Sequence, residues 1–96
     1  MNSELEAAIA AKPGPKVTPQ QIVDAIVAYD YFEHGTLTIC VATLRNGYKV
    51  TGESACADPA NYDMQIGRTL ANTQAREKVW ALEGYLLRQR LHEEGK

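Results

Sequence analysis

The sequence predicts a small α+β fold: an N-terminal helix, an antiparallel β-hairpin and a long C-terminal helix, assembled as a homo-oligomer. The segment TPQQ at 18–21 is typical of a helix start, and Asn46-Gly47 is typical of a tight hairpin turn. The stretch after Asp58-Pro59 keeps a helical apolar period to about His92. With 96 residues, the chain has room for one domain and not for two.

We divide the chain into a leader, residues 1–16, and a single α+β ligand-binding domain, residues 17–96. The leader closes with KPGPK at 12–16, and Pro-Gly-Pro cannot continue a helix. We expect the leader to be flexible, or to form a short helix that matters only when it docks. The first helix of the domain is expected to begin after Thr18 and to end near His34-Gly35, where glycine would supply the C-cap.

Residues 36–44, TLTICVATL, and residues 48–53, YKVTGE, are rich in residues that favour strands. Asn46-Gly47 joins them, which predicts a two-stranded hairpin. An isolated hairpin is only marginally stable in water, so a helix must cover one of its faces or another subunit must extend it.

The apolar positions of the last helix form two stripes, and a single sheet can cover only one of them. Glycines at 67 and 84 each cost a helix about 1 kcal/mol relative to alanine, which indicates close approach of another backbone. A second chain explains both features. The first stripe is Tyr62, Ile66, Leu70 and Trp80; the second is Ala71, Ala75, Val79, Leu82 and Leu86.

Charge and composition exclude several classes of function. The formal net charge is −2 with both signs interspersed, whereas binding to a nucleic-acid polymer requires a dense basic stripe. No apolar run is long enough to span a membrane, and residues 1–6 do not resemble a signal peptide. We expect no cofactor and no metal, because Cys40, Cys56, His34 and His92 lack a metal-ligand spacing. Both cysteines are interpreted as small buried apolar residues.

No residue pattern indicates catalysis. Ser54 follows Gly52-Glu53, but Cys56 stands where a nucleophile elbow needs its second glycine. A Cys56–His92 dyad has no support, and the spacing of Glu77 and Glu83 does not place them on one helix face. We therefore expect a protein that is not an enzyme.

Two segments contain side chains suited to a small anionic ligand. At 58–63, DPANYD, a helix entry offers backbone N–H groups and an aromatic ring at Tyr62. Near the other end of the helix, Arg88 and Arg90 can bind phosphate oxygens. The plainer interpretation is that the first segment only caps the helix and the second only complements its C-terminus. Arg68 and Arg76 are further candidates for phosphate contacts, on physical grounds alone.

One long stretch of the sequence is similar to a known family. Residues 47–62, GYKVTGESACADPANY, followed by Ile66-Gly67, Ala75, Val79-Trp80 and LEGYLL at 82–87, resemble the signature of small tailed-phage proteins labelled gene product 49 / gene product 66. The similarity covers roughly residues 36–91.

The same pattern resembles phage sponge proteins that counter Thoeris immunity. Those proteins bind cyclic ADP-ribose isomers without cleaving them, and some hold cyclic tri-nucleotides at separate sites of a hexamer. The resemblance implies that Tyr62 stacks on adenine, and that Asn72 and a C-terminal arginine complete a pocket between neighbouring subunits. Gln89 occupies the aligned arginine position, so the arginine is either Arg88 or Arg90.

These expectations lead to one preferred hypothesis and two alternatives. The preferred one is a homo-oligomeric phage sponge, built from dimers as a hexamer, that sequesters a cyclic nucleotide signal in the host cytoplasm. The first alternative is a phage interaction protein whose C-terminal helix docks on a host or phage protein. The second is an enzyme that degrades the signal. Tyr62 and Arg88 are roughly 40 Å apart along one helix, so the C-terminal arginines require a second subunit to reach the same ligand.

Overall fold

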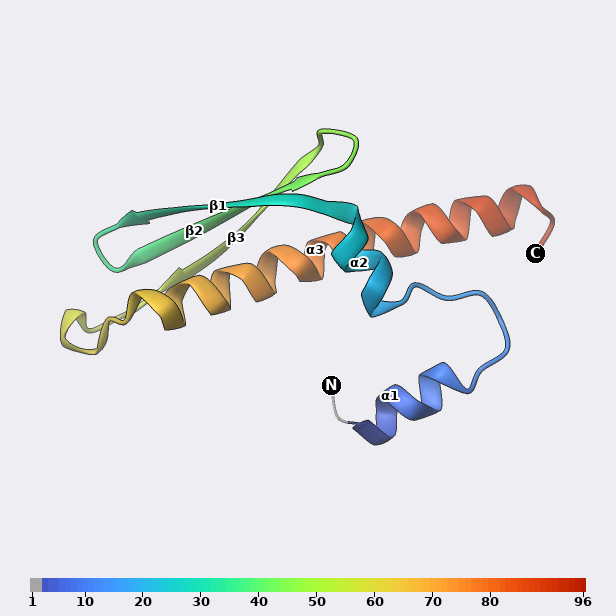
Figure 1. Ribbon diagram of the computed structural model, residues 1–96, viewed down its shortest axis with the longest axis horizontal. Coiled ribbons are helices and arrows are strands. Elements are labelled where there is room, and N and C mark those ends of the chain that lie inside the picture. Colours follow the sequence, from blue (N-terminus) through green and yellow to red (C-terminus); the bar gives the residue numbers. More distant parts are fainter. Residues whose placement is uncertain (1–2) are drawn as a thin grey trace.

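The computed structural model describes residues 3–96. Its elements, in chain order, are α1 (Ser3–Ala10), α2 (Pro19–Ala25), β1 (Ile26–His34), β2 (Leu37–Leu44), β3 (Lys49–Ala55), the 3-10 turn η1 (Pro59–Asn61) and α3 (Met64–Glu93). The strands form one antiparallel sheet in the order β1-β2-β3. The fold is therefore α+β, with a three-stranded sheet and a long C-terminal helix (Figure 1).

The first helix of the domain begins as predicted but is much shorter. Thr18 caps α2 through a complete capping box with Gln21, and Pro19 occupies the first turn. The helix stops at Ala25, so the prediction that it continues to His34-Gly35 was wrong. Residues 26–34 instead form β1, which pairs with β2 along its length.

The physical reason lies in the composition of this segment. IVAYDYFEH is rich in β-branched and aromatic residues, which favour a strand, and its apolar positions fit either period. Pairing with β2 then decides the conformation, because it satisfies the backbone hydrogen-bonding groups of this segment. It also adds a third strand to a hairpin that would be only marginally stable alone. Gly35 is not a helix cap; it has φ +60° in the turn between β1 and β2.

The predicted hairpin is confirmed, and it forms the other two strands of the sheet. β2 and β3 pair from Leu37 opposite Ala55 to Thr43 opposite Lys49. Gly47 has φ +89° in the connecting turn, and the Asn46 side chain accepts a hydrogen bond from the backbone N–H of Tyr48. The glycine conformation and the asparagine side-chain contact are typical of such a turn, although the loop spans residues 45–48 and only Gly47 within it has a positive φ.

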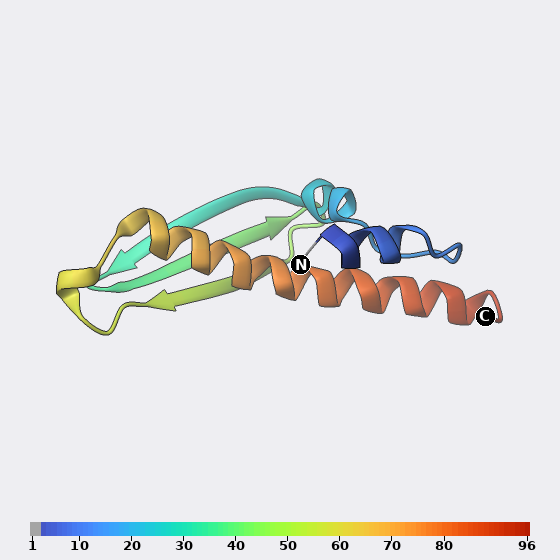
Figure 2. The same ribbon diagram turned by 90° about the horizontal axis from the view of Figure 1, so that it is seen from below.

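α3 covers one face of the sheet and then continues beyond it (Figures 1 and 2). Asp63 caps the helix by accepting hydrogen bonds from the N–H groups of Gln65 and Ile66. The side of β2 that faces α3 is fully buried at Thr38, Cys40 and Ala42. These small residues allow the helix to approach the sheet closely.

The core forms two adjoining clusters along α3. One consists of Cys40, Ala42, Ala71 and Ala75. The other consists of Ile22, Ala25, Leu44 and Val79, with Trp80 packed against it. The second predicted stripe therefore faces the sheet through its alanines and Val79. Its remaining members lie largely beyond the sheet, where Leu86 is 57% exposed.

The two helical glycines differ in their surroundings. A Cβ built at Gly67 would lie 2.6 Å from Oγ1 of Thr38, so the close neighbour there is a side chain of β2 and not the backbone that was predicted. At Gly84, apart from its chain neighbours and the backbone of its own helix, nothing in the described chain lies within 4 Å of such an atom. The expected close approach at Gly84 is therefore absent from a single chain.

The leader lies apart from the sheet (Figure 1). Its described part contains α1, which buries none of its residues, followed by the Pro-Gly-Pro segment. The first two residues of the predicted leader lie outside the described residues. The described chain measures 53 × 34 × 18 Å, an elongated shape set by the length of α3.

Candidate functional site

An open recess of about 430 Å³ lies between β1 and the N-terminal half of α3. It is lined by Tyr31 from β1 and by Gln65, Arg68, Thr69, Asn72, Thr73 and Arg76 from α3. The α3 residues recur at intervals of three and four, so the helix places them on a single face. We call this feature the arginine recess.

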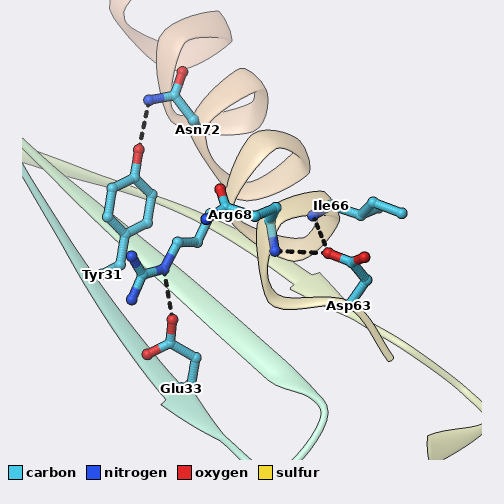
Figure 3. A network of polar contacts seen from close by, with 7 residues as sticks. Tyr31, Glu33, Asp63, Ile66, Arg68 and Asn72 are labelled. Atoms are coloured by element: carbon cyan, nitrogen blue, oxygen red, sulfur yellow. Dashed lines mark hydrogen bonds and ion pairs between the residues drawn. The ribbon is translucent and has the colours of Figure 1, made fainter. Parts of the chain in front are cut away.

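A chain of polar contacts orders one wall of the arginine recess (Figure 3). Nδ2 of Asn72 donates a hydrogen bond to the hydroxyl oxygen of Tyr31 at 2.9 Å. Nε of Arg68 donates to Oε1 of Glu33 at 2.7 Å, and the guanidinium carbon lies 5.1 Å from the centroid of the Tyr31 ring. Tyr31 thus supports the side chains of both Arg68 and Asn72.

The arginine recess is lined by two cations, of which, in the described part of the chain, Arg68 is paired with the carboxylate of Glu33 and Arg76 is not. The hydrogen bond to Glu33 raises the pKa of Arg68, so this side chain stays cationic throughout the physiological range. Arg76 adds a second cation on the same helix face, and among residues 3–96 it forms no ion pair. Burial raises the pKa of the neighbouring Tyr29, with the Arg76 charge and a hydrogen bond to Asn72 opposing that rise.

The structure brings together three of the six predicted site residues. Arg68, Asn72 and Arg76 all line the arginine recess. Tyr62 lines a different recess of about 210 Å³, which also includes Asn61, Asp63 and Gly67. A ligand that contacts both Tyr62 and Asn72 would therefore have to span two recesses of one chain.

The two C-terminal arginines lie at the opposite end of α3 and have local partners. Arg88 donates a hydrogen bond to the backbone carbonyl of Lys96. Arg90 lies 3.6 Å from a carboxylate oxygen of Glu94. Neither residue lines the arginine recess of its own chain.

The helix entry at 58–63 uses its polar groups for capping. Oδ1 of Asp58 accepts a hydrogen bond from the N–H of Ala60, and Oδ1 of Asp63 accepts from two N–H groups of the first turn of α3. The capping interpretation is confirmed at Asp58, whereas the residue that caps α3 is Asp63 and not Asn61. Because the carboxylates of the two aspartates already occupy those N–H groups, the helix entry is a weaker anion site than the arginine recess.

Tyr31 and Glu33 were missed by the sequence prediction because their segment was assigned to a helix. A strand assignment for residues 26–34 places Tyr31 and Glu33 on one side of the sheet, since side chains alternate along a strand. The β-branched and aromatic composition of the segment was the available signal. Because the pairing with β2 was not predicted, composition alone did not outweigh the helical interpretation.

Other kinds of site are not supported by the described part of the chain. Among residues 3–96, no group of histidine, cysteine and acidic side chains could hold a metal ion, and no helix is long and apolar enough to cross a membrane. Cys56 lies beside Tyr62 near the start of α3, whereas His92 is in its last turn, roughly 40 Å away. Cys40 is buried as predicted, and Cys56 is only partly buried.

The fold and its recess define a small α+β protein with a polar, arginine-lined surface on a long helix. Residues 17–91 match the family described as Phage protein (N4 Gp49/phage Sf6 gene 66) family. The match spans most of the chain, and the protein belongs to this phage family. No curated protein and no solved structure gives a significant match.

Proposed function

We propose that this protein is a phage anti-defence sponge that binds and sequesters cyclic nucleotide immune signals without cleaving them. Cyclic ADP-ribose isomers are the first ligand class, and cyclic oligonucleotides are the second. The observation that carries the proposal is the arginine recess, where Arg68, Arg76 and Asn72 lie together beside Tyr31.

The side chains of the arginine recess match the parts of a cyclic nucleotide. Guanidinium groups bind phosphate oxygens with directed hydrogen bonds. An amide such as that of Asn72 pairs with the donor and acceptor edges of a base, and aromatic rings stack on its face. The sponge proteins that the sequence resembles bind ligands of this class.

Exposed apolar side chains on α3 support a homo-oligomer, and we propose dimers that assemble into a hexamer. Ile66 is 60% exposed, Leu70 54%, and Tyr85 71% in the single chain. A second chain packed on α3 removes this surface from water. It also brings the remote Arg88 or Arg90 of one subunit to the recess of another, which no single chain can do.

Calorimetric titration tests the proposal, with a panel of cyclic ADP-ribose isomers and cyclic tri-adenylate as ligands. Arg76→Ala should weaken binding by about 1.5–3 kcal/mol, the usual value of a hydrogen bond to a charged group. Tyr62→Ala should weaken it by about 1–3 kcal/mol if this ring stacks on the base. Arg45→Ala is the matched control, because Arg45 pairs with Glu83 outside the arginine recess.

The outcomes separate the sponge from an enzyme that degrades the signal. Absence of binding to every ligand of the panel contradicts the sponge. Binding followed by recovery of intact ligand after heat denaturation supports it, whereas recovery of a cleaved ligand identifies an enzyme.

The exposed end of α3 favours one second candidate, a phage interaction protein that docks on a host or phage protein. Leu82, Tyr85 and Leu86 are all exposed beside the hairpin turn and line, with Tyr48, an apolar recess of about 250 Å³. Light scattering distinguishes the candidates, because a stable monomer supports docking on a different protein and an oligomer supports the sponge.

A further inference from the structure

We infer that Glu33 is a positioning residue for the arginine recess, which holds the guanidinium of Arg68 ready for a phosphate group. The inference rests on the proposed function and concerns how that site discriminates between correctly and incorrectly placed anions. Glu33 does not line the recess, so its carboxylate acts through Arg68.

Two contacts fix the plane of the Arg68 guanidinium. The Nε–H group is directed at Glu33 with a short 2.7 Å hydrogen bond, and the guanidinium carbon lies 5.1 Å from the centroid of the Tyr31 ring. The Tyr31 hydroxyl is itself fixed by the amide of Asn72 (Figure 3). A flexible arginine is thereby held at one end by charge and along its face by an aromatic ring.

The contact with Glu33 leaves the other end of the guanidinium for a ligand. Within residues 3–96, Arg68 donates its side-chain hydrogen bond through Nε, and neither of its Nη atoms forms a hydrogen bond. Those atoms carry the paired N–H donors that bind phosphate oxygens bidentately. Arg76 provides the contrast, because it lines the same recess without an acidic partner.

Positioning and simple charge predict opposite effects when Glu33 is removed. The carboxylate is a negative charge near an anion site, so its loss alone should tighten anion binding. If Glu33 holds Arg68 in place, its loss makes the ligand order a mobile side chain, which weakens binding. The sign of the change therefore decides between the two roles.

The experiment compares Glu33→Ala and Glu33→Gln with the wild type. Binding is measured by calorimetry with cyclic ADP-ribose and, separately, with inorganic pyrophosphate as a minimal phosphate probe. Glu33→Ala should weaken binding roughly tenfold, whereas Glu33→Gln, whose amide oxygen still accepts from Nε–H, should stay within about threefold of the wild type. Glu53→Ala, an exposed carboxylate of β3 outside the recess, is the matched control and should leave affinity unchanged.

A second measurement follows Arg68 without any ligand. The ¹H–¹⁵N resonance of its Nε–H group, assigned with Arg68→Lys, should be protected from exchange in the wild type and Glu33→Gln and lost in Glu33→Ala. An unchanged resonance in Glu33→Ala overturns the inference, as does binding equal to or tighter than wild type in that variant. If the wild type binds no cyclic nucleotide and no pyrophosphate, the proposed function fails instead. A circular-dichroism melt of each variant identifies any that fails to fold.

Discussion

The two halves of α3 differ in what they contact. The packed half, residues 64–79, lies against the sheet and buries Gly67, Ala71, Ala75 and Val79. The distal half, residues 80–93, extends past the sheet and buries none of its residues. Its contacts with the rest of the chain include Trp80, which packs against the cluster of Ile22, Ala25, Leu44 and Val79, and the ion pair between Glu83 and Arg45.

The side chains of the two halves follow this difference. The packed half faces the sheet with residues so small that backbone meets backbone, as at Gly52 of β3, where an added Cβ would lie 2.5 Å from the backbone nitrogen of Ala75. The distal half instead presents large apolar groups, including Tyr85 and Leu86, to solvent. The packed half contributes most of the buried contacts of α3, and the distal half leaves its large apolar groups uncovered in the single chain.

Glycine-to-alanine substitutions give the largest expected contrast between the halves. At Gly52 a methyl group would overlap the carbonyl oxygen of Ala71, and neither backbone can move without separating α3 from the sheet. We expect Gly52→Ala to reduce the free energy of unfolding by about 3 kcal/mol or more. Urea denaturation measures this effect.

The same substitution at Gly84 should have the opposite sign in a single chain. Apart from its chain neighbours and the backbone of its own helix, nothing within the described chain would contact the new methyl group, and alanine favours a helix over glycine by about 0.8–1 kcal/mol. We expect Gly84→Ala to stabilise the monomer by that amount. If the assembled protein becomes less stable instead, another backbone approaches at Gly84, as the sequence predicted.

Leu86→Ala tests the distal half directly. Leu86 is already 57% exposed, so truncation should change monomer stability by no more than about 0.5 kcal/mol. If a second chain covers it, the dissociation constant of the oligomer should rise roughly tenfold or more, because burying a leucine contributes about 1.5–3 kcal/mol. Analytical ultracentrifugation measures both species across a dilution series.

Val23→Ala is the control for Leu86→Ala. Val23 is 54% exposed on α2 and does not line the apolar recess of Leu82, Tyr85 and Leu86, so its loss should leave assembly unchanged. If both variants weaken assembly equally, or if neither variant weakens it, the distal half has no specific role in assembly.

How far the sequence predicted the fold depended on whether each signal was local. Capping at Thr18 and the turn at Asn46-Gly47 are set by neighbouring residues, and both were predicted correctly. The segment 26–34 pairs with β2 through the turn at Gly35, and its local signals, a strand-favouring composition and a glycine, were also compatible with a helix and its C-cap. Assigning residues 26–34 to a helix left one strand of the sheet unpredicted.

The same error limited the prediction of the site. Arg68, Asn72 and Arg76 share one helix face, which helical spacing explains, but the sequence prediction grouped Asn72 with Tyr62 through the resemblance and named the two arginines separately. Tyr31 and Glu33 come from β1, and no helical reading of residues 26–34 places them against α3. The position of Tyr62 in a separate recess depends on the turn at 59–61, which spacing along a continuous helix does not describe.

The last expected effect concerns pH and the close packing of β2 beneath the packed half. Burial raises the pKa of Cys40, which packs beneath Ala71 and Ala75. Its contribution to stability is fully present below about pH 8.5, where the thiol is protonated in the unfolded chain, and is lost as pH rises through the higher pKa of the folded state. Unfolding free energy should therefore fall above about pH 8.5, by at most about 1.4 kcal/mol per pH unit.

Urea titrations between pH 7.5 and 9.5 measure this slope. Cys40→Ala should flatten it whatever its effect on absolute stability, while Cys56→Ala, which removes the partly buried thiol outside the packed core, should retain it. A slope that survives in Cys40→Ala belongs to another group, such as Tyr29, whose pKa burial also raises. A wild type without the slope would show that water reaches the contact between β2 and α3. The packed half would then be as open as the distal half, and the contrast between them would not hold.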